Sequence, residues 1–121
     1  MKQAVVTKFG APSVIKIRDI DIPEPKNNEI RIKVNFSGIN FAEIMMRMGL
    51  YPGAGKPPCP IGAEASGIID KIGKDVSSEF EINQKVMAFS FGGTHASYIC
   101  VPSDVVMPVP ESYSMQEAAG F

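Results

Sequence analysis

The chain has 121 residues, of which 45% are hydrophobic, and this is enough to bury the core of one domain without disulfides. Its 12 basic and 13 acidic residues are mixed along the chain and give a net charge of −1, which argues against nucleic acid as a partner. No stretch approaches the roughly 18 consecutive apolar residues of a membrane span, and the N-terminus does not resemble a secretion signal.

The two cysteines give information about the compartment. Cys59 and Cys100 are far apart in the sequence and match neither a CxxC motif nor a Cys/His metal-ligand spacing. Two free thiols are typical of a reducing environment. We therefore expect a cytoplasmic protein whose cysteines bind no metal.

Short apolar runs separated by Gly, Pro, Asn or Asp predict about seven strands. Residues 29–36, EIRIKVNF, alternate strictly and predict a half-buried antiparallel strand. Residues 14–22 alternate in two phases, which predicts a β-bulge. Further strands are expected at residues 3–8, 66–72, 85–90, 95–101 and 105–109. This spacing indicates a sandwich or a partly open barrel.

One short helix is predicted after the strand at residues 29–36. Asn40 is a favoured N-cap, Glu43 can complete a capping box, and Gly49 provides a left-handed exit. Glu43 also precedes Arg47 by four residues, the favourable order for an exposed ion pair. An apolar stripe of this helix is expected to pack on the sheet, and it consists of Phe41, Ile44, Met45 and Met48.

The pattern of residues gives no self-sufficient active site. Residues 50–61, LYPGAGKPPCPI, contain too many breakers for regular structure and are long enough to border a cleft. The glycine clusters lack the geometry of a phosphate-binding loop. His95, the only histidine, is expected to be a partly exposed structural residue within a strand, and Glu64 is either a buried, hydrogen-bonded carboxylate or an exposed turn residue.

Three segments in order resemble the N-terminal catalytic domain of the medium-chain dehydrogenases/reductases. They are SGINFAEIMMRMGLYP, PCPIGAEASGIIDKIGKDVSSEFEINQKVMAF and GGTHASYICVPSDVVMPVPESYSMQEAAGF. The chain is most similar to the zinc-independent quinone oxidoreductase branch, including its vesicle amine transport protein-like members. The resemblance implies a mainly β, GroES-like partly open barrel with one short α-helix and the start of a C-terminal helix.

The same resemblance implies reduction without a metal. Zinc-dependent relatives have a cysteine ligand at the position of Asn40 and a histidine ligand at the position of Ala63, and neither residue present here replaces them. The expected chemistry is hydride transfer from NADPH to a quinone or an activated double bond, without zinc. Asn40 is then the candidate catalytic residue, with its amide bonding the nicotinamide or the substrate oxygen, although helix capping alone also explains it.

Further candidate residues come from the family positions around this helix. Met45 is a candidate cofactor contact, at a position where bacterial quinone reductases commonly carry a tyrosine. Phe41, Tyr51 and Glu64 are candidates for the substrate cleft, and no residue is assigned as a metal ligand.

Residues 1–121 correspond to the GroES-like domain of this family, and the Rossmann cofactor domain is absent from them. We therefore expect the isolated chain to be inactive and to self-associate, whereas the parent enzyme forms a homodimer. Two alternatives remain open: a relative of the zinc alcohol dehydrogenases that has lost its metal, and a non-enzymatic GroES-like assembly module.

Overall fold

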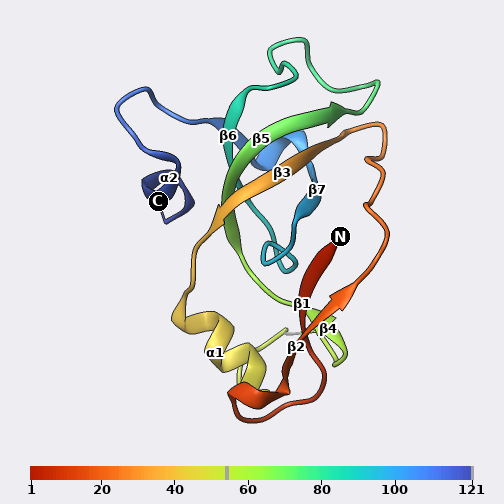
Figure 1. Ribbon diagram of the computed structural model, residues 1–121, viewed down its shortest axis with the longest axis vertical. Helices are drawn as coiled ribbons and strands as arrows, with labels where there is room; N and C mark the ends of the chain where they lie inside the picture. The colour runs from red at the N-terminus through yellow and green to blue at the C-terminus, as the bar shows by residue number, and fades with distance from the viewer. Residues whose placement is uncertain (54, 121) are drawn as a thin grey trace.

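The computed structural model describes residues 1–53 and 55–120, which form two antiparallel sheets (Figure 1). The larger sheet has the strand order β7-β3-β5-β6-β8. Its strands are β3 (Glu29–Ser37), β5 (Glu64–Ile72), β6 (Lys85–Phe89), β7 (Tyr98–Pro102) and β8 (Val106–Pro108). The smaller sheet has the order β2-β1-β4, with β1 (Lys2–Val6), β2 (Ile15–Asp19) and β4 (Cys59–Pro60).

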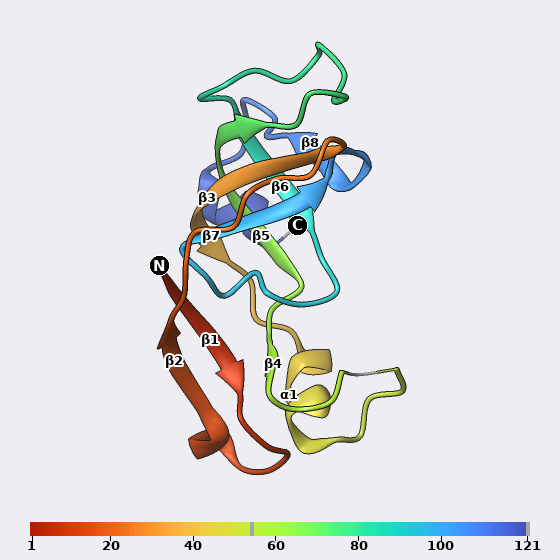
Figure 2. The same ribbon diagram turned by 90° about the vertical axis from the view of Figure 1, so that its right-hand side faces the viewer.

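The helices lie at different ends of the molecule. Helix α1 (Phe41–Met48) accompanies the smaller sheet, and α2 (Met115–Ala119) lies against β5 of the larger one (Figures 1 and 2). Ser114 and Glu117 form a capping box at the start of α2: the Ser114 backbone N–H donates to Glu117 Oε1 at 3.1 Å, and Ser114 Oγ accepts from the Glu117 backbone N–H at 3.0 Å. Hydrogen bonding to the Ser114 backbone, followed by that to its side chain, lowers the pKa of Glu117. Two 3-10 turns, Pro12–Val14 and Ser103–Val105, precede β2 and β8.

The curl of the larger sheet originates in β3 and β5. The register of this pair shifts between Arg31 and Ile32 and again between Val34 and Phe36, and such bulges bend and twist a sheet. The main core lies inside the curl and consists of Ile30, Ile32, Ala65, Ile69, Val86, Ala88, Ile99, Val101 and Val106. The mainly β, partly open barrel expected from the sequence is therefore confirmed, as are the strand at residues 29–36 and the helix that follows it.

Two local expectations are wrong. Residues 14–22 contain no bulge, because β2 pairs with β1 without a register shift and ends at Asp19, where the alternation changes phase. Residues 50–61 are not wholly irregular, because Cys59 and Pro60 form β4 and pair with Val6 and Val5. A proline is tolerated there because β4 is an edge strand that needs no donor on its outer side.

Candidate functional site

Asn40 stands at the N-cap position of α1 but does not cap it. Its backbone is extended (φ −119°, ψ 155°), and its side chain makes no hydrogen bond to the first turn. Instead, Asn40 Nδ2 donates to Glu64 Oε1 at 3.0 Å. The predicted cap is therefore wrong: the carboxyl oxygen at the start of β5 draws the amide away from the helix. The predicted left-handed exit at Gly49 is confirmed by its φ of 78°.

Gly38 makes the approach of Glu64 to Asn40 possible. The Gly38 backbone N–H donates to the Glu64 carbonyl oxygen at 3.1 Å, which joins the end of β3 to the start of β5. A methyl group at Gly38 would overlap Glu64 Oε1. The carboxyl group thus occupies the space that a side chain at residue 38 would need.

The expected roles of Glu43 are also wrong. The Glu43 side chain is only 7% exposed, and its Oε2 lies 2.8 Å from His95 Nε2. It therefore neither returns a bond to the Asn40 backbone nor pairs with Arg47 at the surface. Because α1 turns this residue toward the protein interior, the buried carboxyl group finds the histidine in place of solvent or arginine.

A chain of hydrogen bonds continues from His95 to the end of β3. His95 Nδ1 lies 2.8 Å from Ser37 Oγ, which lies 2.9 Å from Thr94 Oγ1 and 3.0 Å from the Glu64 carbonyl oxygen. His95 is therefore structural and partly exposed, as expected, but it precedes β7 and does not lie within the strand.

The hydrogen bonds of this chain depend on one another, because Ser37 links Glu64 to His95 and has only one proton to donate. Ser37 has one hydroxyl proton and three hydrogen-bond partners: the Glu64 carbonyl oxygen, which can only accept, and Thr94 Oγ1 and His95 Nδ1, which can donate or accept. When Ser37 donates to Glu64, His95 Nδ1 must itself donate to Ser37. The chain thus connects Glu43 on α1, through His95 and Ser37, to the backbone carbonyl of Glu64. Glu64 is also the residue whose side chain holds Asn40.

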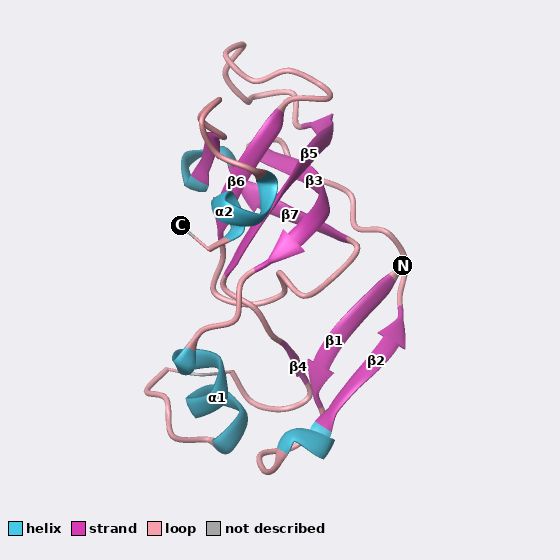
Figure 3. Ribbon diagram, turned by 60° about the vertical axis from the view of Figure 1, so that its left-hand side comes forward, coloured by secondary structure: helices cyan, strands magenta, loops and turns pink. Residues whose placement is uncertain are grey.

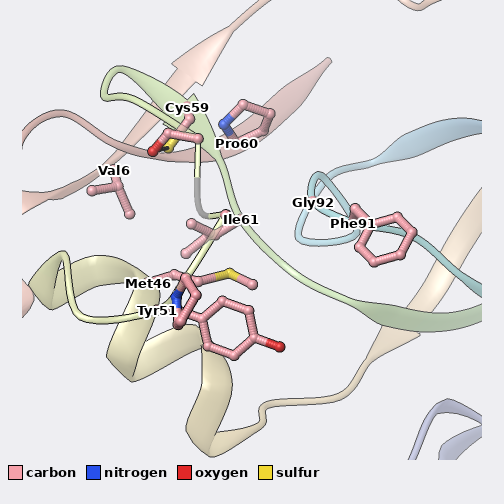
Figure 4. A pocket seen from close by; sticks show the side chains of 11 residues that line it. Val6, Met46, Tyr51, Cys59, Pro60, Ile61, Phe91 and Gly92 are labelled. Carbon is pink, nitrogen blue, oxygen red and sulfur yellow. Dashed lines mark hydrogen bonds between the residues drawn. The ribbon is translucent and has the colours of Figure 1, made fainter.

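Asn40, Tyr51 and Glu64 line one cavity of about 380 Å³. Its other lining residues are Ala42, Met46, Gly62, Ala63, Phe89, Ser90 and Phe91. A neighbouring cavity of about 520 Å³ shares Met46, Tyr51 and Phe91 with the first. In Figure 4, Met46 and Tyr51 lie together by α1 and Phe91 lies across from them. The result is a largely apolar space with an amide and a carboxyl group at its wall.

The structure brings together some of the predicted site residues and separates others. Phe41 is 73% exposed and Met45 is half-buried, and neither lines the cavity. Met46 lines it instead of Met45. The expectation that this stripe packs on the sheet is wrong, because Phe41, Ile44 and Met48 are 73%, 40% and 48% exposed, whereas the buried face of α1 carries Glu43.

Two aromatic residues of the cavity wall, Phe89 and Phe91, were not predicted from the sequence. Phe89 and Phe91 pack edge to face, with ring centroids 5.3 Å apart, and are 48% and 92% exposed. The signal was the FSF triplet at residues 89–91, where an alternating strand runs into the glycine pair that follows.

In the part of the chain that the structure describes, no three His, Cys, Asp or Glu side chains are grouped so that they could hold a metal ion. None of the helices found there is long and apolar enough to pass through a bilayer.

Comparison with known proteins defines the class of this domain. Residues 26–111 match the family model of the alcohol dehydrogenase GroES-like domain. The synaptic vesicle membrane protein VAT-1 homolog-like of Mus musculus is 34% identical over 121 residues, which is all of this chain but 29% of that protein. The crystal structure of the human VAT-1 homolog-like protein superposes with a TM-score of 0.96 at 34% identity and covers 100% of this chain and 39% of its own.

Quinone oxidoreductases are the second group of relatives. The Escherichia coli quinone oxidoreductase, solved as a complex with NADPH, superposes with a TM-score of 0.92 at 29% identity, covering 100% of this chain and 37% of that one. The chain therefore belongs to the alcohol dehydrogenase GroES-like domain family, in the medium-chain dehydrogenase/reductase superfamily, with quinone oxidoreductases and VAT-1-like proteins as its relatives. The chain spans well under half the length of these relatives.

Proposed function

We propose that this domain forms one wall of the hydride-transfer site of an NADPH-dependent quinone or enone oxidoreductase that works without zinc. The observation that carries the proposal is the Asn40–Glu64 hydrogen bond of 3.0 Å at the wall of a largely apolar cavity. The bond fixes the orientation of the amide before any ligand arrives, and preorganised polar groups in a dry site favour catalysis.

The groups that Asn40 keeps available fit a nicotinamide. Its side chain makes this one hydrogen bond among the described residues, so the oxygen and the second N–H remain for a ligand. An acceptor beside a donor complements the primary carboxamide of nicotinamide, and the same N–H can donate to the oxygen of a quinone or enone. When bound, NADPH supplies the hydride. Asn40 would orient the ring and polarise the substrate oxygen, while Met46 and Phe91 provide apolar surface in the cavity wall.

The side chains of the site support a reaction without zinc. Asn40 offers a neutral amide that Glu64 already engages, and Ala63 in the cavity wall offers a methyl group. Neither replaces the thiolate or imidazole that typical catalytic zinc sites use. The unpaired thiols of Cys59 and Cys100 support placing the reaction in a reducing compartment such as the cytoplasm.

A second domain would hold most of the cofactor. The family relatives are much longer than this chain, which spans 29% of the mouse VAT-1 homolog-like protein. We propose that a Rossmann-type domain binds the pyrophosphate and forms the opposite wall. Residues 1–121 alone are then expected to show no quinone-dependent oxidation of NADPH, and turnover by the purified chain would contradict this division of labour.

A chimera tests the proposal. Residues 1–121 would replace the matching segment of the E. coli quinone oxidoreductase, and quinone-dependent NADPH oxidation would be measured. We expect activity in the chimera, a loss of about tenfold or more in kcat/KM for Asn40→Ala, and no change for Asn35→Ala, an exposed residue of β3. A folded chimera that binds NADPH but reduces no quinone, or one that is indifferent to Asn40→Ala, contradicts the proposal.

A further inference from the structure

The larger cavity, of about 520 Å³, adjoins the cavity that Asn40 lines. Its walls come from β1, α1, β4 and the loop after β6, and Figure 3 shows β4 between α1 and the β1–β2 hairpin. Neither Asn40 nor Glu64 is among its described lining residues. None of these described residues is charged, and Tyr51 and Cys59 alone among them carry a hydroxyl or a thiol. The larger cavity therefore offers no charged side chain to a carboxylate or a phosphate group.

The two cavities meet between side chains that stand on opposite sides. Met46, Tyr51 and Phe91 line both cavities. Met46 and Tyr51 lie together by α1, while Phe91 lies across from them (Figure 4). Because the shared side chains stand on opposite sides and not in one partition, the cavities join in the space between them. Tyr51 and Phe91 are 41% and 92% exposed, so a ligand can reach this junction.

One wall of the larger cavity belongs to the smaller apolar core of the protein. Val6 and Ile61 are 1% and 8% exposed and lie in one buried cluster, against which Cys59 packs. All three residues line the larger cavity. An apolar chain placed there would extend this core, and each methylene group that it buries favours binding. At the junction, the same chain would cover the exposed ring of Phe91.

We propose that the substrate of this domain is a quinone or enone that carries an apolar side chain, an alkyl or prenyl group, which lies in the larger cavity. The inference rests on the proposed function and names the substrate class of the same site. The carbonyl oxygen would accept from Asn40, and the chain would pass between Tyr51 and Phe91 toward the smaller core. The cofactor is the competing occupant, but its phosphate would find no charged side chain among the described lining residues.

Binding of three ketones to the 121-residue chain tests the inference without turnover. The probes are 4-methylacetophenone, 4-butylacetophenone and 4-(4-acetylphenyl)butanoate, which share the ring and its carbonyl group and, unlike quinones, do not add to thiols. The butanoate carries a carboxylate at the end of a chain as long as the butyl group. In titrations followed by amide NMR, we expect 4-butylacetophenone to bind at least about tenfold tighter than either of the others. All three should shift the side-chain amide of Asn40, and the butyl probe alone should shift Val6 and Ile61.

Cys59 reports the position of the chain, because it lines the larger cavity and not the smaller one. In Cys100→Ser protein, 4-butylacetophenone should slow the alkylation of Cys59 by iodoacetamide, whereas 4-methylacetophenone at equal occupancy should not. Phe91→Ser removes a wall that both cavities share and should reduce the preference for the butyl probe. Ile17→Ser, a change at an exposed apolar residue outside both linings, should leave that preference unchanged.

Several results would overturn the inference. Equal affinity for the methyl and butyl probes, or no saturable binding of the butyl probe, would mean that the larger cavity takes no apolar chain. Unprotected Cys59, or an unchanged preference in Phe91→Ser, would place the chain elsewhere. Tighter binding of the butanoate, or shifts of Val6 and Ile61 with reduced nicotinamide mononucleotide, would assign the larger cavity to the cofactor. None of these results alters the chimera test of the proposed function, so the two failures can be told apart.

Discussion

Asn40 Nδ2 lies 3.0 Å from Glu64 Oε1, so the residue at the N-cap position of α1 bonds to the start of β5 and not to its own helix. The backbone N–H groups of the first turn therefore receive no hydrogen bond from the Asn40 side chain. Helix ends of this kind favour negative charge, such as the charge that develops on a reduced carbonyl or quinone oxygen.

Replacing Gly38 should disturb the site and the fold together. Gly38→Ala would force Glu64 away from Asn40, because the new methyl group and Glu64 Oε1 need the same space. We expect a loss of about 1–3 kcal/mol in the free energy of unfolding, measured in urea. Gly55→Ala is the matched control, since a methyl group there finds its nearest neighbour at 3.7 Å, an ordinary contact. Equal stability of the two variants would show that both Glu64 and the Ala119 carbonyl oxygen, which lies 2.8 Å from the added methyl group, can move aside.

The Glu43–His95 pair should show strong energetic coupling. His95→Phe leaves Glu43 Oε2 buried without its partner, and Glu43→Leu leaves His95 Nε2 in the same condition. The losses in unfolding free energy of the two single variants should add up to more than the loss in the double variant. We expect a coupling energy of about 1–3 kcal/mol in this double-mutant cycle, measured by urea unfolding. Additive effects would mean that the pair contributes nothing beyond its separate contacts.

Arg31 should be the main polar support of the curled sheet. Its Nε and Nη2 bond the two Asp70 oxygens at 2.9 and 3.2 Å, and its guanidinium lies 5.7 Å from the centre of the Tyr98 ring. The hydrogen bond with Asp70 raises the pKa of Arg31. Arg31→Lys loses the bidentate geometry and should cost about 1–3 kcal/mol of stability. Thermal unfolding of both variants measures this loss. Lys33→Arg, a change at an exposed residue of the same strand, should leave the stability unchanged.

The thiol of Cys100 should be poorly reactive. Burial, followed by the nearby Glu29 carboxylate, raises its pKa to about 11. Because the thiolate is the nucleophile, alkylation of native Cys100 by iodoacetamide should be slow at pH 8 and accelerate as the pH approaches 11. The unfolded chain should react at the ordinary pKa near 9.0. Mass spectrometry of Cys59→Ser protein follows this one site, and rapid labelling of the folded protein at pH 8 would contradict the prediction.

That raised pKa also fixes the sign of a pH effect on stability. The folded protein holds the Cys100 proton more tightly than the unfolded chain does, so its contribution is fully present below about pH 9. It is lost as the pH rises toward 11. Stability of Cys100→Ala protein should therefore fall less over this interval than stability of the unchanged protein.

The sequence predicted the strands, the helix and the family because each rests on local periodicity or on ordered motifs. Strict alternation identified β3. The side-chain partners of α1 were not predictable in the same way. Asn40 and Glu43 form an ideal capping box by spacing, yet their partners, Glu64 and His95, lie 24 and 52 residues away. Only the tertiary fold brings such groups within reach.

The role of Asn40 can be measured directly on its side-chain amide. In a titration of the chain with reduced nicotinamide mononucleotide, the two side-chain N–H signals of Asn40 are expected to shift, while those of Asn35 on β3 stay in place. Asn40→Asp sets a second carboxyl group against Glu64 and is expected to abolish the remaining shifts around the cavity. Binding that leaves the Asn40 amide signals unmoved would contradict the central claim.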